Sequence, residues 1–337
     1  MVGNYVWILR RLFYTVIVVF ALTTVVFLSL HLLPGDPVHA LVGERASHES
    51  VERIRLKYNL DKPLYIQYAT WLRNVLRGDF GTSILSKRPV IDEIMAKLPH
   101  TLELIILSQS IAILLAIFLG VLSAVKQHTI LDYLTTVLSV LGVSMPAFWL
   151  ALMLIITFSV KLDWFPTHGL MGTGVPLRTI SQSYLIDALL TGNLLALGSF
   201  LKHAFLPCVV LATIPLSYIT RLTRSSMLEV MNEEYVWTAR AKGLSEFKVI
   251  FKHALRNALI PVIIMSGVIT GLLMGGAVLT ETVFGLPGMG RLLVDSIAVR
   301  DFPVALACVL LFAAGYNLIN LAADIVCGLV DVRASYD

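Results

Sequence analysis

A charged, helical stretch at residues 233–261 holds the residue types best suited to a specific interaction. It opens with Glu233 and Glu234, continues through the small and basic residues of Ala239–Gly243, and ends at Pro261. Long apolar segments flank the stretch on both sides. In so apolar a chain, a polar helical loop of this length predicts a surface on which a second protein docks.

Sequence motifs for catalysis or nucleotide binding are not found. Neither His-Glu-x-x-His nor Gly-x-Ser-x-Gly occurs, and no Gly-x-x-x-x-Gly-Lys-Ser/Thr is present to cradle phosphates. The eight histidines are scattered, and His31, His100 and His203 stand near the ends of apolar segments, where we expect them to anchor the chain at a membrane surface. We therefore expect no catalytic residue, no metal site and no cofactor bound by this chain.

The composition is that of a membrane protein. The chain is 57% hydrophobic and 14% charged, with a mean hydropathy of +0.81, whereas soluble domains carry about 25% charged residues. A helix needs about 20 apolar residues to cross a bilayer. Six segments meet that length: 12–33, 101–125, 132–160, 204–222, 258–284 and 303–330. We predict an all-α polytopic membrane protein with six transmembrane helices. The formal charge of +4 is spread along the chain and does not indicate nucleic-acid binding.

The first span and the basic residues set the expected orientation. The apolar run Leu12–Leu33 is too long for a signal-peptide core, so we expect it to be retained. Lys and Arg near span ends favour the cytoplasmic side. They gather on one side of the predicted spans: Arg10, Arg11, Lys126, Arg221, Arg224, Arg240, Lys242, Lys248, Lys252, Arg256 and Arg333. Both termini are therefore predicted to be cytoplasmic.

The chain divides into three predicted parts. Residues 1–33 form the cytoplasmic N-terminus and first span, and residues 34–99 form a small external helical subdomain. Within it, Glu49–Leu60 and Leu64–Leu76 read as short amphipathic helices. Residues 100–337 form the transmembrane core, which contains a cytoplasmic loop at 223–257.

Helix breakers and polar residues mark several spans. Gly142, Pro146, Pro207 and Pro215 predict kinks in the third and fourth spans, or ordinary membrane-helix packing. A stripe of Gly267, Gly271 and Gly275 lets two helix backbones approach closely, within the chain or against a second subunit. Asn317, Asn320 and Asp324 share one face of the last span, and Asp324 is expected to be water-accessible or to cap the helix. Cys208, Cys308 and Cys327 are expected to be buried free thiols.

The charged stretch resembles a known family. Thr238–Leu244, with its glycine at Gly243, resembles the cytoplasmic EAA loop of ABC-importer permeases. Two departures stand out, because Trp237 and Thr238 replace the Glu and first Ala, and the downstream proline comes late, at Pro261. These departures match one subfamily, the dipeptide/oligopeptide/nickel permeases.

Further motifs support that resemblance over almost the whole chain. They are Arg221–Val230, Leu279–Phe284, Pro287–Arg291, Arg300–Pro303, Leu33–Pro37 and Gly78–Gly81. The chain is most similar to the B-type dipeptide permease subunit of this family.

The resemblance implies a type I ABC importer permease fold in a bacterial or archaeal cytoplasmic membrane. It also implies a second homologous permease, two cytoplasmic ATPase subunits that hold ATP and Mg, and an extracytoplasmic substrate-binding protein. The ATPases would contact the residues Glu234, Thr238, Ala239, Arg240, Ala241, Lys242, Gly243 and Leu244.

The expected cargo is a dipeptide or short oligopeptide, and nickel is the alternative. Nickel favours imidazole or soft ligands, and no His pair at helical spacing or Met/His cluster is visible. A secondary transporter is disfavoured because the spans show no clear internal repeat and almost no central charge. We expect the substrate pathway to include Ser144, Met145, Pro146, Thr213, Pro215 and Gly271.

Overall fold

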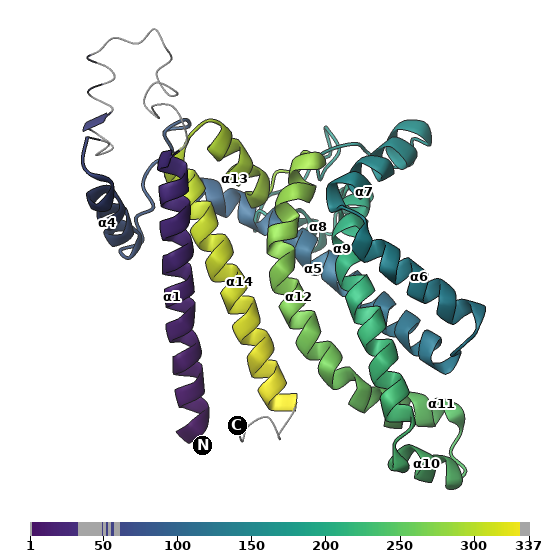
Figure 1. The fold of residues 1–337 in the computed structure, drawn as a ribbon. Coiled ribbons are helices and arrows are strands. Elements are labelled where there is room, and N and C mark those ends of the chain that lie inside the picture. Colours follow the sequence, from purple (N-terminus) through teal and green to yellow (C-terminus); the bar gives the residue numbers. More distant parts are fainter. Residues whose placement is uncertain (1, 33–48, 50–51, 53–54, 57–60, 331–337) are drawn as a thin grey trace.

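The computed structural model describes residues 2–32, 49, 52, 55–56 and 61–330, and these residues are mostly helical (Figure 1). The motif at Leu33–Pro37, most of the predicted helix Glu49–Leu60, Arg333 and the side chains of Asp324 and Cys327 lie outside the described part. In chain order the helices are α1 Val2–Leu32, α4 Leu64–Val75, α5 Val90–Val125, α6 Ile130–Ser144, α7 Ala147–Leu154, the π-helical η1 Ile155–Lys161, α8 Tyr184–Leu190, α9 Leu194–Met231, α10 Glu234–Ala241, α11 Glu246–Lys248, the π-helical η2 Val249–Ala254, α12 Leu255–Val283, α13 Met289–Ala298 and α14 Phe302–Val330.

The predicted spans correspond to long apolar helices. Among the described residues, α5, α9, the continuous helix Glu246–Val283 and α14 are each long and apolar enough to cross a membrane. The bent pair of Ile130–Ser144 and Ala147–Lys161 adds a fifth candidate, and the apolar part of α1, Phe13–Ser29, is slightly shorter. The all-α polytopic fold is confirmed, and the six predicted spans are consistent with these helices.

The second span begins earlier than its hydropathy indicates. α5 starts at Val90 and continues through Pro99, so the expected end of the external segment at residue 99 falls inside a helix. Its first turns carry Asp92, Glu93 and Lys97, which lower the local hydropathy and conceal the helix start in the sequence.

Only one of the prolines singled out in the sequence breaks its span. Met145 has an extended backbone (φ −80°, ψ 127°) and Pro146 is the N-cap of α7, so the third span bends by 107°. A proline disfavours the helical backbone at the residue before it, and Met145 has left the helical region. Pro207 and Pro215 instead lie within the continuous helix α9.

The glycine stripe of α12 packs within the chain. A Cβ on Gly267 would overlap the Cβ of Ala323, and one on Gly271 would lie 3.0 Å from the Tyr316 ring and 3.1 Å from Asn320 Oδ1. A Cβ on Gly275 would meet nothing within 4 Å. Two of the three glycines therefore allow α12 to approach α14 closely. At these two positions the stripe serves packing within the chain.

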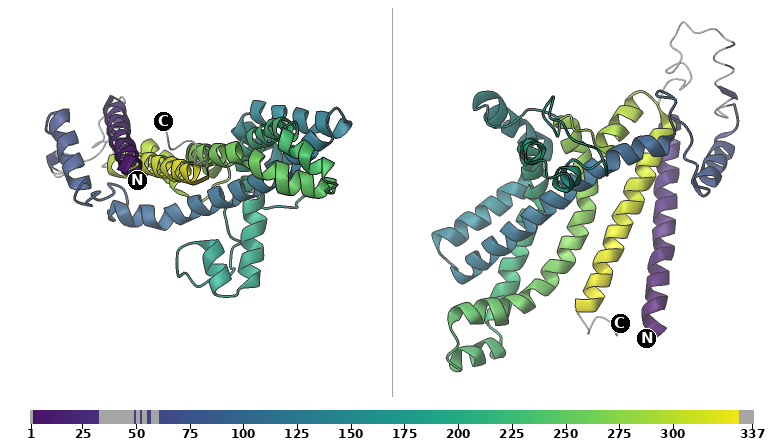
Figure 2. Two further views of the ribbon diagram at one scale, coloured as in Figure 1. Left: turned by 90° about the horizontal axis from the view of Figure 1, so that it is seen from below. Right: turned by 180° about the vertical axis from the view of Figure 1, so that it is seen from behind.

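The helices place the loops at two opposite ends. α10 and α11 lie at the lower end in Figure 1, the same end as the start of α1 and the end of α14, whereas α4, α7 and α13 lie toward the upper end. Figure 2 shows α1, α14 and α12 following one another in a row, and α12 packs in turn on α9. The charged loop thus lies at the same end of the molecule as the N-terminus.

The predicted helix at Leu64–Leu76 is confirmed as α4, which packs on the upper half of α1. The Tyr68 hydroxyl lies 2.8 Å from Thr24 Oγ1 and 3.2 Å from Thr23 Oγ1, and its ring centre lies 5.1 Å from that of Phe27. This contact holds α4, which lies between the first two spans, against α1.

We predict that Gly267→Val destabilises the chain, whereas Gly275→Val serves as the matched control on the same helix. Overpacking of a close helix contact costs about 1–3 kcal/mol. The midpoint of thermal unfolding in detergent should fall for Gly267→Val and change little for Gly275→Val. Equal midpoints for both variants would contradict the assigned α12–α14 packing.

Candidate functional site

The loop between α9 and α12 forms a compact helical unit at the lower end of the molecule (Figure 1). α10 follows α9 after a short turn, and the chain re-enters helix at Glu246. Val236 and Ala239 of α10 are buried against Val249 of η2. One face of α10 is therefore held by the chain's own next helix, which leaves the other face free.

Gly243 terminates this helix with a left-handed backbone. Its φ is +76°, its amide donates to the Arg240 carbonyl at 2.9 Å, and the Leu244 amide donates to the Ala239 carbonyl at 3.4 Å. A glycine in this conformation is the common end of a helix. A Cβ at Gly243 would meet nothing within 4 Å, so the backbone rather than crowding favours glycine here.

The predicted coupling residues divide into an exposed set, one half-buried residue and one buried residue. Arg240 is half-buried: its Nε lies 3.0 Å from Glu246 Oε1 and its guanidinium carbon lies 5.4 Å from the centre of the Trp237 ring. The Ala239 side chain is buried and contributes almost nothing to the exposed surface. The exposed residues are Glu234, Thr238, Ala241, Lys242, Gly243 and Leu244.

Exposed aromatic residues of this unit were not identified from the sequence. Trp237 is 59% exposed and Phe247 70%, and the Phe247 ring centre lies 4.6 Å from that of Phe251. The spacing of Phe247 and Phe251, four residues apart just after the Gly243 turn, was the available signal. Exposed apolar groups gathered in one unit mark an interaction surface. We call the residues Trp237, Thr238, Lys242, Leu244, Phe247 and Phe251 the α10 surface.

The α10 unit is attached to both neighbouring spans. Asn257 Nδ2, near the start of α12, donates to the Tyr235 hydroxyl at 2.7 Å. The turn at Asn232 connects α10 directly to the end of α9. A displacement of α10 therefore acts on α9 and α12 together.

A buried ion pair joins α9 to the α5–α6 hairpin. Arg224 Nε and Nη2 donate to Asp132 Oδ1 and Oδ2 at 2.6 and 2.9 Å. Ser123 Oγ and the His128 amide also donate to this carboxylate, at 2.5 and 3.1 Å. The Asp132 side chain is only 4% exposed. Bidentate Arg–carboxylate pairs fix both distance and orientation, so α9 and α6 are tied near the α10 unit.

The structure places the predicted pathway residues on the α6–α7 bend, on α9 and on α12. Ser144, Met145 and Pro146 occupy the bend between α6 and α7. A Cβ on the neighbouring Gly142 would meet Thr213 and Ser217 of α9, which brings Thr213 beside the end of α6. Pro215 is buried in α9. Gly271 instead packs on α14, because its small size allows that helix contact.

Two acids within the quoted motifs have structural roles that the sequence did not reveal. Glu281 is fully buried and accepts from Thr101 Oγ1 at 2.6 Å and from the amides of Gly290 and Arg291 at 2.7 and 3.1 Å. Asp301 Oδ2 accepts from Ser83 Oγ at 2.5 Å and from the following amide of Ile84 at 3.0 Å. These acids hold the upper end of the molecule together.

Comparison with known proteins identifies the family of this chain. Residues 116–336 match the family described as "Binding-protein-dependent transport system inner membrane component", and residues 5–105 match its N-terminal component. The chain belongs to this family of transport permeases. It is a multi-pass membrane protein and a component of a binding-protein-dependent transport system.

Several curated relatives match over nearly their full length. The dipeptide transport system permease protein DppB of Alkalihalophilus pseudofirmus is 39% identical over 328 residues, covering 97% of this chain and 98% of the relative. The di/tripeptide transport system permease protein DppB of Pseudomonas aeruginosa is 42% identical over 331 residues, covering 97% and 98%. The oligopeptide transport system permease protein AppB of Bacillus subtilis is 40% identical over 330 residues, covering 98% and 99%.

We predict that Arg224→Met destabilises the chain because it leaves the Asp132 carboxylate buried without its ion-pair partner. Loss of one partner of a buried pair costs about 3 kcal/mol. The double variant Asp132→Asn/Arg224→Met should recover most of the lost thermal stability in detergent, because the neutral Asn oxygen can accept from the His128 amide while its NH2 group donates to Ser123 Oγ. A double variant no more stable than Arg224→Met would refute this account of the pair.

Proposed function

We propose that this chain is the permease subunit of an ATP-driven importer of dipeptides or short oligopeptides. The observation that carries the proposal is the identity of 39–42%, over nearly the full length of both chains, with permeases named for dipeptide, di/tripeptide and oligopeptide transport. Because the alignments cover nearly all of both chains, they support the same transport function for this chain.

In this proposal the α10 surface docks onto a cytoplasmic ATPase. The exposed Trp237 and Phe247 give the surface apolar anchors, and Lys242 adds a basic group. Aromatic residues dominate the binding energy of many protein interfaces. Nucleotide and Mg belong to the ATPase subunits, two of which act with this permease and a second homologous one. Both termini then face the cytoplasm, and the end that carries α13 faces outward.

The proposed mechanism uses the attachments of α10. When the ATPases close on ATP, they displace α10, and its links to α9 and α12 transmit the movement to the spans. The Asp132–Arg224 pair carries α6 along with α9. The third span is bent at Met145–Pro146, and its movement against Thr213 opens the pathway toward one side and closes it toward the other. This is a rigid-body transition of the hinge type.

Nickel is the second candidate cargo, and the chain offers little to hold it. Among the described residues, no group of three or more His, Cys, Asp or Glu side chains is arranged to hold a metal ion. The identity with peptide permeases and the lack of such a group among the described residues therefore both favour peptide as the cargo.

The deciding experiment is uptake of a labelled dipeptide by cells that lack this chain, with and without its restoration. Longer peptides and nickel are added as competitors. We expect restored uptake that other dipeptides block and nickel does not. Restored nickel accumulation without peptide uptake would refute the cargo, and dependence on proton or sodium gradients instead of ATP would refute the transporter class.

We predict that Gly243→Val uncouples ATP hydrolysis from uptake, while Gly243→Asn retains most of the coupling. A left-handed backbone costs a residue with a Cβ about 1–2 kcal/mol, and Asn visits it more readily than a β-branched residue. Membrane insertion should be normal for both, as judged by the amount of chain in washed membranes. Coupled uptake at the wild-type rate in Gly243→Val would exclude a coupling role for this turn.

We also predict that Trp237→Ala and Phe247→Ala reduce recovery of the ATPase subunits when the permease is purified. Truncation of a central aromatic anchor costs about 2 kcal/mol or more, which corresponds to a fall in affinity of more than tenfold. Trp164→Ala is the matched control, because Trp164 is 57% exposed and belongs to the loop that follows η1. Equal ATPase recovery in all three variants would count against docking at the α10 surface.

A further inference from the structure

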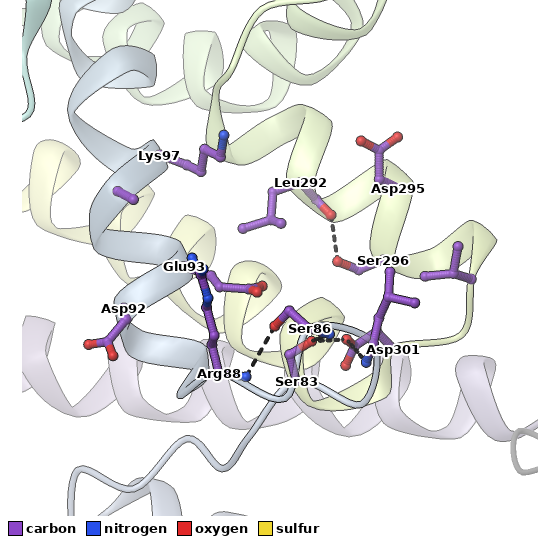
Figure 3. A pocket seen from close by; sticks show the side chains of 13 residues that line it. Ser83, Ser86, Arg88, Asp92, Glu93, Lys97, Leu292, Asp295, Ser296 and Asp301 are labelled. Carbon is purple, nitrogen blue, oxygen red and sulfur yellow. Dashed lines mark hydrogen bonds between the residues drawn. The ribbon is translucent and has the colours of Figure 1, made fainter. Parts of the chain in front are cut away.

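A charged pocket of about 470 Å³ lies at the upper end of the molecule. Figure 3 shows it between the start of α5, helix α13 and the segment 83–88. This end is opposite to the α10 unit (Figure 1). The proposed mechanism does not use this pocket, which we call the α5–α13 socket.

Acidic groups outnumber basic groups around the socket. Its lining contains the four carboxylates of Asp92, Glu93, Asp295 and Asp301, against the two basic side chains of Arg88 and Lys97. Asp295 pairs with Arg291, at 3.5 Å, but both side chains are exposed and their attraction is weak. Within the described part of the chain, no ion pair involves Asp92 or Glu93. The excess of carboxylates favours a cationic occupant.

Asp301 provides an independent sign that a partner is missing. It is only 3% exposed and lines the socket, and its Oδ2 accepts from Ser83 Oγ and from the amides of Ile84 and Leu85. Its Oδ1 is buried and has no hydrogen-bond partner among the described residues. An unpaired buried carboxylate oxygen is costly and calls for a donor.

The geometry points to an organic cation rather than a metal ion. The described acids do not assemble into a group of three that could hold a metal. An ammonium or guanidinium group instead brings several hydrogen-bond donors and needs no fixed coordination shell. Lysine and arginine side chains have the length to enter a socket of this kind from a docked protein.

We propose that the α5–α13 socket receives a lysine or arginine side chain of the extracytoplasmic binding protein. The inference rests on the proposed function, which assigns this end of the molecule to the external side. The charge of the socket complements such a side chain, and its position on α5 and α13 places it on rigid elements. The socket therefore determines how tightly the loaded binding protein engages this permease.

The test uses the complete transporter reconstituted in proteoliposomes, with ATP hydrolysis measured as the concentration of its peptide-loaded binding protein is varied. The variants are Glu93→Gln and Glu93→Lys. Asp163→Asn and Asp163→Lys are the controls, because Asp163 is exposed, belongs to the loop after η1 and does not line the socket. Asp301 is left unchanged because it holds the segment 83–85.

We expect the apparent KM for the binding protein to rise about tenfold in Glu93→Lys and by less in Glu93→Gln, with kcat unchanged. In the wild type, added salt should raise the KM for the binding protein. This rise should be smaller in both Glu93 variants, because one charge pair is lost. The Asp163 controls should match the wild type. Normal kcat at saturating binding protein shows that the variants fold.

Three outcomes would overturn the inference. The first is a KM for the binding protein that is unchanged in both Glu93 variants. The second is an equal rise in the Asp163 controls, which would reduce the effect to general surface charge. The third is a changed KM for the peptide alone, which would make the peptide ammonium the occupant. If the binding protein does not stimulate the wild type at all, the proposed function fails instead.

Discussion

The upper end of this structure depends on the burial of one carboxyl group inside an apolar helix bundle. Glu281 has no exposure, and its oxygens are satisfied by the hydroxyl of Thr101 on α5 and by two amides at the start of α13. A charged or polar group in this environment is stable only with such partners. Glu281 therefore fixes α5, α12 and α13 relative to one another.

The Glu281 carboxyl group also restricts which residues fit just before α13 and in its first turn. A Cβ on Gly290 would lie 2.9 Å from Glu281 Oε2 and 2.6 Å from the Val278 backbone, and one on Gly288 would overlap the carboxyl group itself. Glycine at these positions lets the α13 amides reach Glu281. Thr101 completes the arrangement, since its hydroxyl accepts from the Met289 amide at 2.8 Å while donating to Glu281. The walls of the α5–α13 socket are held by this network.

The sequence predicted the parts of this molecule that depend on hydropathy and regular spacing. The apolar segments became helices, and the motif around Gly243 became a helix that ends in a left-handed turn. Features that depend on tertiary contacts were not predictable. Pro146 breaks its span while Pro207 does not, and spacing alone did not show that Gly271 contacts Asn320 and Tyr316 of α14.

The roles of the two buried acids were likewise not predictable from the sequence. Glu281 and Asp301 stood within motifs, but their roles require Thr101 and Ser83, which are far away in the sequence. Ala239 was expected on the docking surface because small residues permit close approach. The structure uses that property for the contact with Val249 instead.

The contact between α1 and α14 has a consequence for how the chain is made. Phe27 of the first span packs on Phe302, Ala305 and Leu306 of the last. Because α14 follows all the helices between them, α1 gains this neighbour much later in synthesis than it gains α4. Until then its apolar face and the hydroxyls of Thr23 and Thr24 must be accommodated by lipid, α4 or the insertion machinery. A nascent chain cut short before α14 would leave this face of α1 without the side chains that cover it in the folded protein.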